Sequence, residues 1–318
     1  MVKKALLVSV IVVICSVRSW AQQDPQFTHY MFNTLYYNPG FAGVEGVTKL
    51  TAIHRSQWLG YTPTSGGGGA PTTQLISMTA PIFKLNSGFG AYIVNDKLGA
   101  QNNLEAQASY AYHLGIKNSK LSLGVRAGMY SQTINYDLYR KIDPNDPLLK
   151  DKTGSESQIR PDVAIGVYWR KEKYYVGVSI NHLLKSTFDF GVAQRNALQP
   201  HVYITGGYFY EVNFDLKFQF MTIIQSDFNK ETVNLGAIAY FKDTMWGGLS
   251  FRQSEAAILM FGYSLLKDKS LKLGYGLDYV IQNQDAKQPT SHELMLTYEL
   301  PVNPGSGKKV VRTPRYRH

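Results

Sequence analysis

Glu105, His113 and Arg126 are the side chains whose types and spacing could support chemistry, because they place a carboxylate, an imidazole and a guanidinium on neighbouring segments. A set of this kind could exchange protons or hold a charged group. No nucleophile in a defined sequence motif accompanies it. We therefore predict that these groups pair inside the fold, and that the protein is not an enzyme.

A second polar group stands in the stretch HRSQWLG, just before a loop that contains four consecutive glycines. Arg55, Gln57 and Trp58 could hold that loop or an incoming protein domain. For Trp58, a place at the membrane interface, where indole rings accumulate, is an equally good interpretation.

The first 21 residues have the composition of a signal peptide. Lys3 and Lys4 precede an apolar run over residues 5–17, and the stretch SWA supplies a cleavage site, so we expect cleavage near Ala21 and export of the chain. The single cysteine, Cys15, would leave with this peptide. The mature protein could then form neither a disulfide nor a thiolate metal site, and we predict no metal and no cofactor.

The formal net charge of +10 is concentrated near the two ends. Three positive residues belong to the predicted signal peptide. Five more belong to a predicted periplasmic tail, residues 302–318: Lys308, Lys309, Arg312, Arg315 and Arg317. The body between them is nearly neutral, which argues against nucleic-acid binding. The tail could contact a negatively charged partner or cell-wall component, or be a disordered end.

Alternating apolar and polar residues dominate the rest of the chain. Between residues 104 and 114 the apolar residues recur at every second position, and Glu105 and His113 stand on the other face; Arg126 lies on the corresponding face of the next segment. This period of two indicates strands. About fourteen such segments follow one another over residues 46–301, most of them long enough for a tilted membrane crossing.

The connections between these segments alternate in length. Short turns such as FKLN, IKNS and KEK alternate with mostly longer loops, such as residues 61–71, 134–158 and 183–199. Short turns at one end and long loops at the other are typical of an outer-membrane barrel. We therefore predict an all-β fold, a single antiparallel transmembrane β-barrel, in preference to a soluble β-sandwich. Aromatic residues near segment ends, Trp246 among them, would then form interfacial girdles or be ordinary strand aromatics.

The stretch DPQFTHYMFNTLYYNPGFAG, within residues 22–45, has too many aromatic residues to remain in water. We predict that it enters the lumen as a plug or lies against the periplasmic rim, with a turn at Asn38, Pro39 and Gly40. Such a segment could gate the pore or bind a partner, or simply fill the lumen. Its candidate contact residues before the turn are Phe27, Tyr30, Met31 and Phe32.

Three stretches, QFTHYMFNTLYYNPGFAG, HRSQWLG and GAPTTQLIS, resemble the opening of the PorP/SprF family of type IX secretion and gliding membrane proteins, and the later SINHLLK is similar to a further family element. The sequence departs from the family at His54 and in its lengthened first loop, which bears on the subgroup and its cargo.

The resemblance implies an outer-membrane component of the type IX secretion and gliding machinery. Its implied partners are the periplasmic ring, a peptidoglycan-binding lipoprotein, the translocon and the C-terminal domain of exported cell-surface adhesins. The alternative function is a passive or substrate-selective channel, which would need an open lumen.

Overall fold

A computed structural model of the chain describes residues 24–63, 68–139, 149, 152–191, 196–282 and 287–300. The predicted signal peptide, part of the glycine loop and the predicted basic tail with Lys308, Lys309, Arg312, Arg315 and Arg317 lie outside the described residues.

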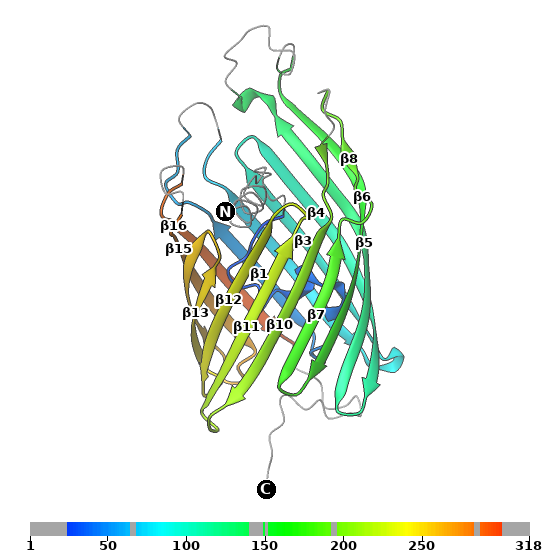
Figure 1. The fold of residues 1–318 in the computed structure, drawn as a ribbon, viewed down its shortest axis with the longest axis vertical. Coiled ribbons are helices and arrows are strands. Elements are labelled where there is room, and N and C mark those ends of the chain that lie inside the picture. Colours follow the sequence, from blue (N-terminus) through cyan, green and yellow to red (C-terminus); the bar gives the residue numbers. More distant parts are fainter. Residues whose placement is uncertain are drawn as a thin grey trace, which may run out of the picture.

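Fourteen strands close into one antiparallel barrel, which confirms the fold predicted from the sequence (Figure 1). Each barrel strand pairs with the barrel strands before and after it in the chain, and β1 closes the ring by pairing with β16, with Ile53 opposite Met295. Closure leaves no strand edge unpaired. A sheet that spans a membrane needs this closure, because lipid offers its backbone no hydrogen-bond partners.

The first seven barrel strands are β1 (Lys49–Ser56), β2 (Thr72–Ile82), β3 (Ser87–Leu98), β4 (Gln101–Ile116), β5 (Ser119–Asn135), β6 (Ser155–Lys171) and β7 (Tyr174–Asn181). The other seven are β10 (His201–Glu211), β11 (Leu216–Ser226), β12 (Glu231–Phe241), β13 (Met245–Arg252), β14 (Ala256–Ser264), β15 (Leu271–Val280) and β16 (Thr290–Glu299). The short helices are α2 (Thr34–Tyr37), η1 (Pro39–Phe41), η2 (Phe83–Leu85) and η3 (Tyr136–Leu138). Within the described residues, no helix has the length and apolar character needed to cross a membrane.

The alternation in the sequence separates an outer face from a lumen face. In β4, Leu104 and Tyr110 are exposed on the outside, whereas Glu105, Gln107 and Ser109 are buried. Because successive side chains of a strand point to opposite sides, the apolar half meets lipid and the polar half lines the interior.

The two ends of the barrel differ. The six turns that follow β2, β4, β6, β10, β12 and β14 are short and lie at the lower end of the barrel in Figure 1. The four longer connections, residues 57–71, 136–154, 182–200 and 281–289, join strands at the opposite end, together with three short turns after β3, β11 and β13. At that end β5 and β6, with 17 residues each, extend beyond most other strands. We call these the short-turn end and the long-loop end.

The loop between β7 and β10 contains a small hairpin that periodicity did not predict. It consists of β8 (Thr187–Phe188) and β9 (Asn196–Ala197), which pair antiparallel. Strands of two residues are too short to show any alternation. Phe188 packs there with Tyr130, Phe190 and Leu198.

The expectation that Trp246 belongs to an aromatic girdle is wrong. Its side chain is buried in the lumen, with ring centroids 4.9 Å from Phe32 and 5.7 Å from His29. Gly262 and Gly274 on the next two strands provide the space, since a Cβ at Gly262 would stand 2.3 Å from the indole. Position along the strand suggested an interface, but parity along β13 directs the ring inward.

Candidate functional site

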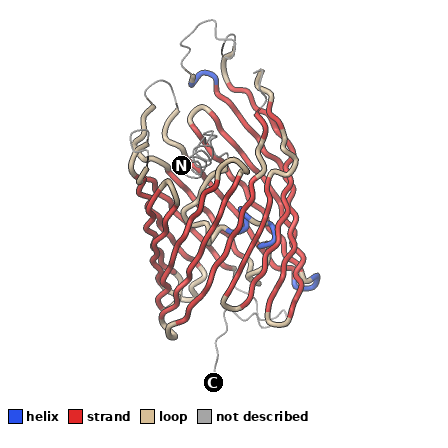
Figure 2. The backbone as a smooth tube through the Cα atoms, in the orientation of Figure 1, coloured by secondary structure: helices blue, strands red, loops and turns tan. Residues whose placement is uncertain are grey.

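Residues 24–47 run through the interior of the barrel, and we call them the lumen segment. At the long-loop end, Asp24 contacts His182 beside the end of β7. Near the short-turn end, Lys120 at the start of β5 donates a hydrogen bond to the carbonyl oxygen of Val44. Most side chains between these points are buried, and Figure 2 shows α2 and η1 within the ring of strands. The segment therefore occupies the lumen along much of its length.

Aromatic rings of the lumen segment pack against distant parts of the wall. Tyr36 makes edge-on contacts with Phe27 at 5.2 Å and with Tyr92 of β3 at 5.3 Å. Tyr37 packs in the same way against Tyr203 of β10, at 5.2 Å. Such pairs contribute about 0.5–1.5 kcal/mol each beyond the burial of their area. Because β3 and β10 are well separated in the ring, these contacts span the lumen.

The stretch Asn38-Pro39-Gly40 makes a turn that is seated on the wall. The Asn38 side-chain amide donates to the carbonyl oxygens of Val167 and Val178, at 3.0 and 3.3 Å, and its oxygen accepts from the Gly40 N–H at 2.8 Å. Val167 and Val178 face each other across β6 and β7. One asparagine thus fixes both the turn and its position.

Two glycines that are paired across β5 and β6, Gly124 and Gly166, make room for this turn. A Cβ at Gly124 would lie 2.3 Å from the backbone nitrogen of Gly40. A Cβ at Gly166 would lie 2.2 Å from Oδ1 of Asn38. The wall and the lumen segment therefore fit each other at the level of single atoms.

Gly124→Val is expected to displace the turn while leaving the barrel folded, because valine suits a strand and the clash is with the backbone of the lumen segment. Overpacking of this kind costs about 1–3 kcal/mol. Hydrogen exchange of the Phe41 amide, which is bonded to the Asn38 carbonyl, should accelerate accordingly. The matched control is Gly115→Val, where nothing lies within 4 Å of an added Cβ. Equal protection in both variants would contradict the fit described above.

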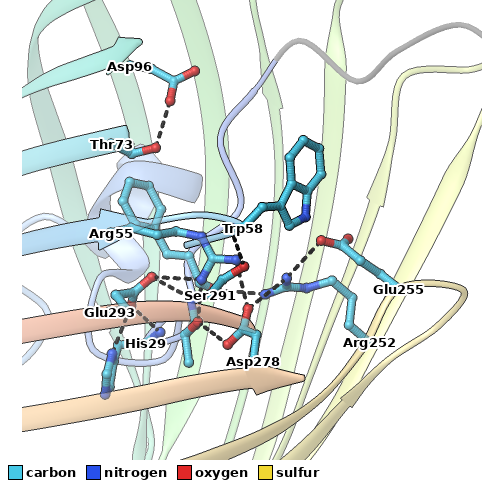
Figure 3. Close-up of polar contacts among 12 residues, drawn as sticks. His29, Arg55, Trp58, Thr73, Asp96, Arg252, Glu255, Asp278, Ser291 and Glu293 are labelled. Carbon is cyan, nitrogen blue, oxygen red and sulfur yellow. Dashed lines mark hydrogen bonds and ion pairs between the residues drawn. The ribbon is translucent and has the colours of Figure 1, made fainter. Parts of the chain in front are cut away.

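A cluster of buried charged side chains lies in the long-loop half of the lumen, and we call it the charge cluster (Figure 3). The guanidinium of Arg55 is 2.7 Å from Asp278 and 3.5 Å from Glu293. Arg252 approaches the same Asp278 oxygen at 3.2 Å. The side chains of these four residues are at most 2% exposed. Two cations thus compensate two carboxylates in a dry site, as buried charges require.

The lumen segment completes the hydrogen bonding of this cluster. The backbone N–H groups of Thr28 and His29 donate to the two oxygens of Glu293, each at 2.8 Å. The Thr28 hydroxyl accepts from Arg55 and donates to Asp278, both at 2.6 Å. The carboxylates of the wall therefore bind the segment as well as the arginines.

A second polar group, the histidine cluster, holds the start of the lumen segment. Asp24 accepts hydrogen bonds from Nε2 of His182 at 2.9 Å and from the Tyr203 hydroxyl. The other nitrogen of His182, Nδ1, is 3.0 Å from Asp162, and Nδ1 of His201 is 3.7 Å from Asp24. Asp24, Asp162, His182 and His201 are all buried.

Electrostatics favour charged forms of Asp24 and His182. Burial opposes ionisation of Asp24, but His182, His201 and the hydrogen bond from Tyr203 hold the pKa of its carboxyl below the usual range. Burial also disfavours the imidazolium of His182, yet Asp24 and Asp162 hold the pKa of that ring well above its usual value. Without a bound cation, these neighbours favour the charged forms of both groups over the neutral pair.

The residues predicted as contacts of the N-terminal segment lie in one place. Phe27 and Tyr30 are buried in the main aromatic and aliphatic core, and Met31 and Phe32 pack against it. Asn38, Pro39 and Gly40 form the seated turn.

The remaining predicted residues are dispersed. Arg55 belongs to the charge cluster, but Gln57 and Trp58 lie beyond the strand: the Trp58 amide binds Ser291 at 3.1 Å, and its ring contacts Tyr61. Glu105 and Arg126 both contact the side chain of Tyr92. The Tyr92 hydroxyl donates a hydrogen bond to Glu105 at 3.0 Å, and the Arg126 guanidinium lies over the Tyr92 ring at 5.1 Å.

Arg126 and His113 both act on the lumen segment. Arg126 donates to the carbonyl oxygen of Tyr36 at 2.7 Å. His113 lies toward the short-turn end, bonded to the Ala42 carbonyl at 2.9 Å. The three lumen residues therefore do not form a single set.

Sequence reasoning missed several members of both clusters: Asp24, His29, Asp162, His182, His201, Arg252, Asp278 and Glu293. The alternation in the sequence places Asp278 on the polar face of its strand, and this pattern indicates a side chain that faces the lumen. Its partner Arg55 is more than 200 positions away, and only closure of the ring brings the two together.

Comparison with known proteins identifies a family. The family described as "Type IX secretion system membrane protein PorP/SprF" matches residues 19–298. No curated protein matches the chain in sequence.

Several solved structures are similar to this chain, each with a TM-score below 0.5. Omp33 of Acinetobacter baumannii is 7% identical, with a TM-score of 0.44 over 80% of this chain and 98% of its own. The CymD monoaromatic hydrocarbon channel is 11% identical, with a TM-score of 0.49 over 85% of this chain and 93% of its own. A FadL homologue of Pseudomonas aeruginosa is 14% identical, with a TM-score of 0.42 over 87% and 95% of the two chains.

Proposed function

The chain belongs to the PorP/SprF family of type IX secretion system membrane proteins, and from this membership we propose that it is a non-enzymatic binding component of the type IX secretion and gliding machinery. Its fold and family support a place in the outer membrane. In this role the barrel supports the secretion or surface attachment of exported adhesins by binding their C-terminal domains, periplasmic machinery components, or both.

The observation that carries the proposal is the occupied lumen. The lumen segment is bonded to the wall at the charge cluster, at the Asn38 turn and at the histidine cluster. A channel would need an open path, whereas a binding component gains from a rigid body. The alternative function, a passive or selective channel, would require the lumen segment to leave.

We assign the proposed partners to the two ends of the barrel. With the short-turn end in the periplasm, that end would meet the periplasmic ring, the peptidoglycan-binding lipoprotein and the translocon. The exposed lysines of its turns, Lys84, Lys117, Lys173 and Lys242, offer positive charge to such partners. The long-loop end would receive the adhesin C-terminal domain.

The test is a strain that lacks this chain. We expect adhesins with type IX C-terminal domains to be lost from the cell surface or retained in the cell, and uptake of small solutes to be unchanged. Complementation with the full chain should restore the surface adhesins. An unaltered set of surface proteins together with impaired solute uptake would overturn the proposal in favour of a channel.

A further inference from the structure

The histidine cluster gathers metal-type ligands from three separate elements. Asp24 comes from the lumen segment, His182 follows β7, and His201 begins β10. One donor atom from each lies within 4.8 Å of the others, and all three residues are buried. Two imidazoles and one carboxylate form a set that suits zinc and other divalent transition ions, and such three-ligand sites leave a further position open.

The surroundings orient these donors. Asp162 binds Nδ1 of His182 at 3.0 Å and is itself held by Gln107 at 3.0 Å. This contact leaves Nε2 of His182 directed at Asp24. A carboxylate on the far nitrogen of a histidine is the usual second contact of a metal-binding imidazole, because it fixes the ring and raises its basicity.

His201 contributes an unsatisfied atom. Its Nδ1 is 3.0 Å from the Gln199 carbonyl, and its Nε2 has no hydrogen-bond partner among the described residues although the side chain is about 2% exposed. A buried polar atom without a partner is costly. Because Nε2 is unpartnered within the described residues, the Gln199 contact is what holds the ring, and a cation beside Nδ1, which lies 3.7 Å from Asp24, would replace that contact.

Charge balance points the same way. In the charge cluster, Arg55 and Arg252 pair with Asp278 and Glu293, and Arg252 also pairs with the less buried Glu255 at 3.4 Å. In the histidine cluster, Asp24 and Asp162 form their ion pairs in the described part of the chain with histidines alone. A divalent ion would compensate both carboxylates without requiring a buried imidazolium.

We propose that Asp24, His182 and His201 bind a divalent transition-metal ion of the zinc class, with Asp162 positioning His182. The ion ties the start of the lumen segment to the wall between β7 and β10. The site thus serves to retain the segment in the barrel, and it needs no partner protein.

The experiment measures metal in the intact protein. The chain is purified in detergent without chelator, its metal content is determined by mass spectrometry, and chelator-treated protein is refolded with ZnCl2 alone and analysed again. We expect about one equivalent of zinc in wild type. His201→Ala should lose it, and Asp162→Asn should bind about 10–100-fold more weakly. The matched control His54→Ala, an exposed histidine on the outer face of β1, should retain it.

The folded state of each variant is checked by its heat-modified mobility in gels, and the wild-type titration decides the matter even if a variant misfolds. Wild-type protein that neither carries zinc nor takes it up at micromolar concentration would overturn the proposal. So would retention of zinc by folded His201→Ala, or equal binding of Mg²⁺, which prefers oxygen ligands alone.

Discussion

Replacing Arg55 with alanine is expected to lower the free energy of unfolding by about 3–5 kcal/mol, the usual cost of removing one partner from a buried ion pair. The guanidinium contacts Asp278 at 2.7 Å and the Thr28 hydroxyl at 2.6 Å. Without it, Arg252 at 3.2 Å would compensate Asp278 only in part. Glu293 would keep only the hydrogen bonds from Thr28 and His29.

The measurement is urea unfolding of the refolded barrel in lipid vesicles, followed by tryptophan fluorescence. His54→Ala is the matched control, because His54 neighbours Arg55 on β1 but faces outward and is exposed. Its unfolding free energy should remain within about 0.5 kcal/mol of wild type. A change below about 1 kcal/mol for Arg55→Ala would show that the charge cluster does not hold the lumen together.

Deleting residues 24–43 is expected to turn a non-conducting barrel into a conducting one. Barrels of 16–18 strands leave an aqueous channel, and fourteen strands approach that size. The deletion would remove Tyr36 and Tyr37, which bridge the lumen, and the turn seated on Gly124. It would also leave the polar wall residues Glu105 and Arg126 facing water, which favours wetting of the lumen.

Single-channel recording in planar bilayers measures this effect. Residues 1–23, which contain the predicted signal peptide, are kept, and a chain lacking residues 302–318 serves as a control for truncation itself. Wild type and the control should show no steady conductance, and the deletion variant should conduct. A folded deletion variant that stays closed, or wild type that conducts equally, would show that the lumen segment does not seal the barrel.

The sequence alone was sufficient to predict the barrel because its cause is local. In β4, lipid requires Leu104 and Tyr110 on one side, and the lumen accepts Glu105 and Gln107 on the other, so a period of two appears in the residues themselves. Side-chain parity also placed Glu105 and Arg126 on the lumen face.

The site was predictable only in part because its partners are set by closure. Nothing local to Arg55 indicates Asp278 or Thr28, since β1 meets the last strands only when the ring closes. Trp246 is a different case: its place near a strand end suggested the membrane interface, although parity along β13, which the sequence contains, directs it inward, above Gly262. His182 lies in a stretch that resembles the family, but its hydrogen-bond partner Asp24 belongs to another part of the chain.

We propose that the barrel is a binding component of the secretion machinery. The most direct test of this proposal is crosslinking in native outer membranes, purification of the chain in mild detergent, and identification of what accompanies it by mass spectrometry. We predict recovery of periplasmic type IX ring components or the C-terminal domain of a large adhesin. Recovery of the barrel alone, with steady conductance of the wild-type protein in planar bilayers, would contradict the claim and indicate a channel.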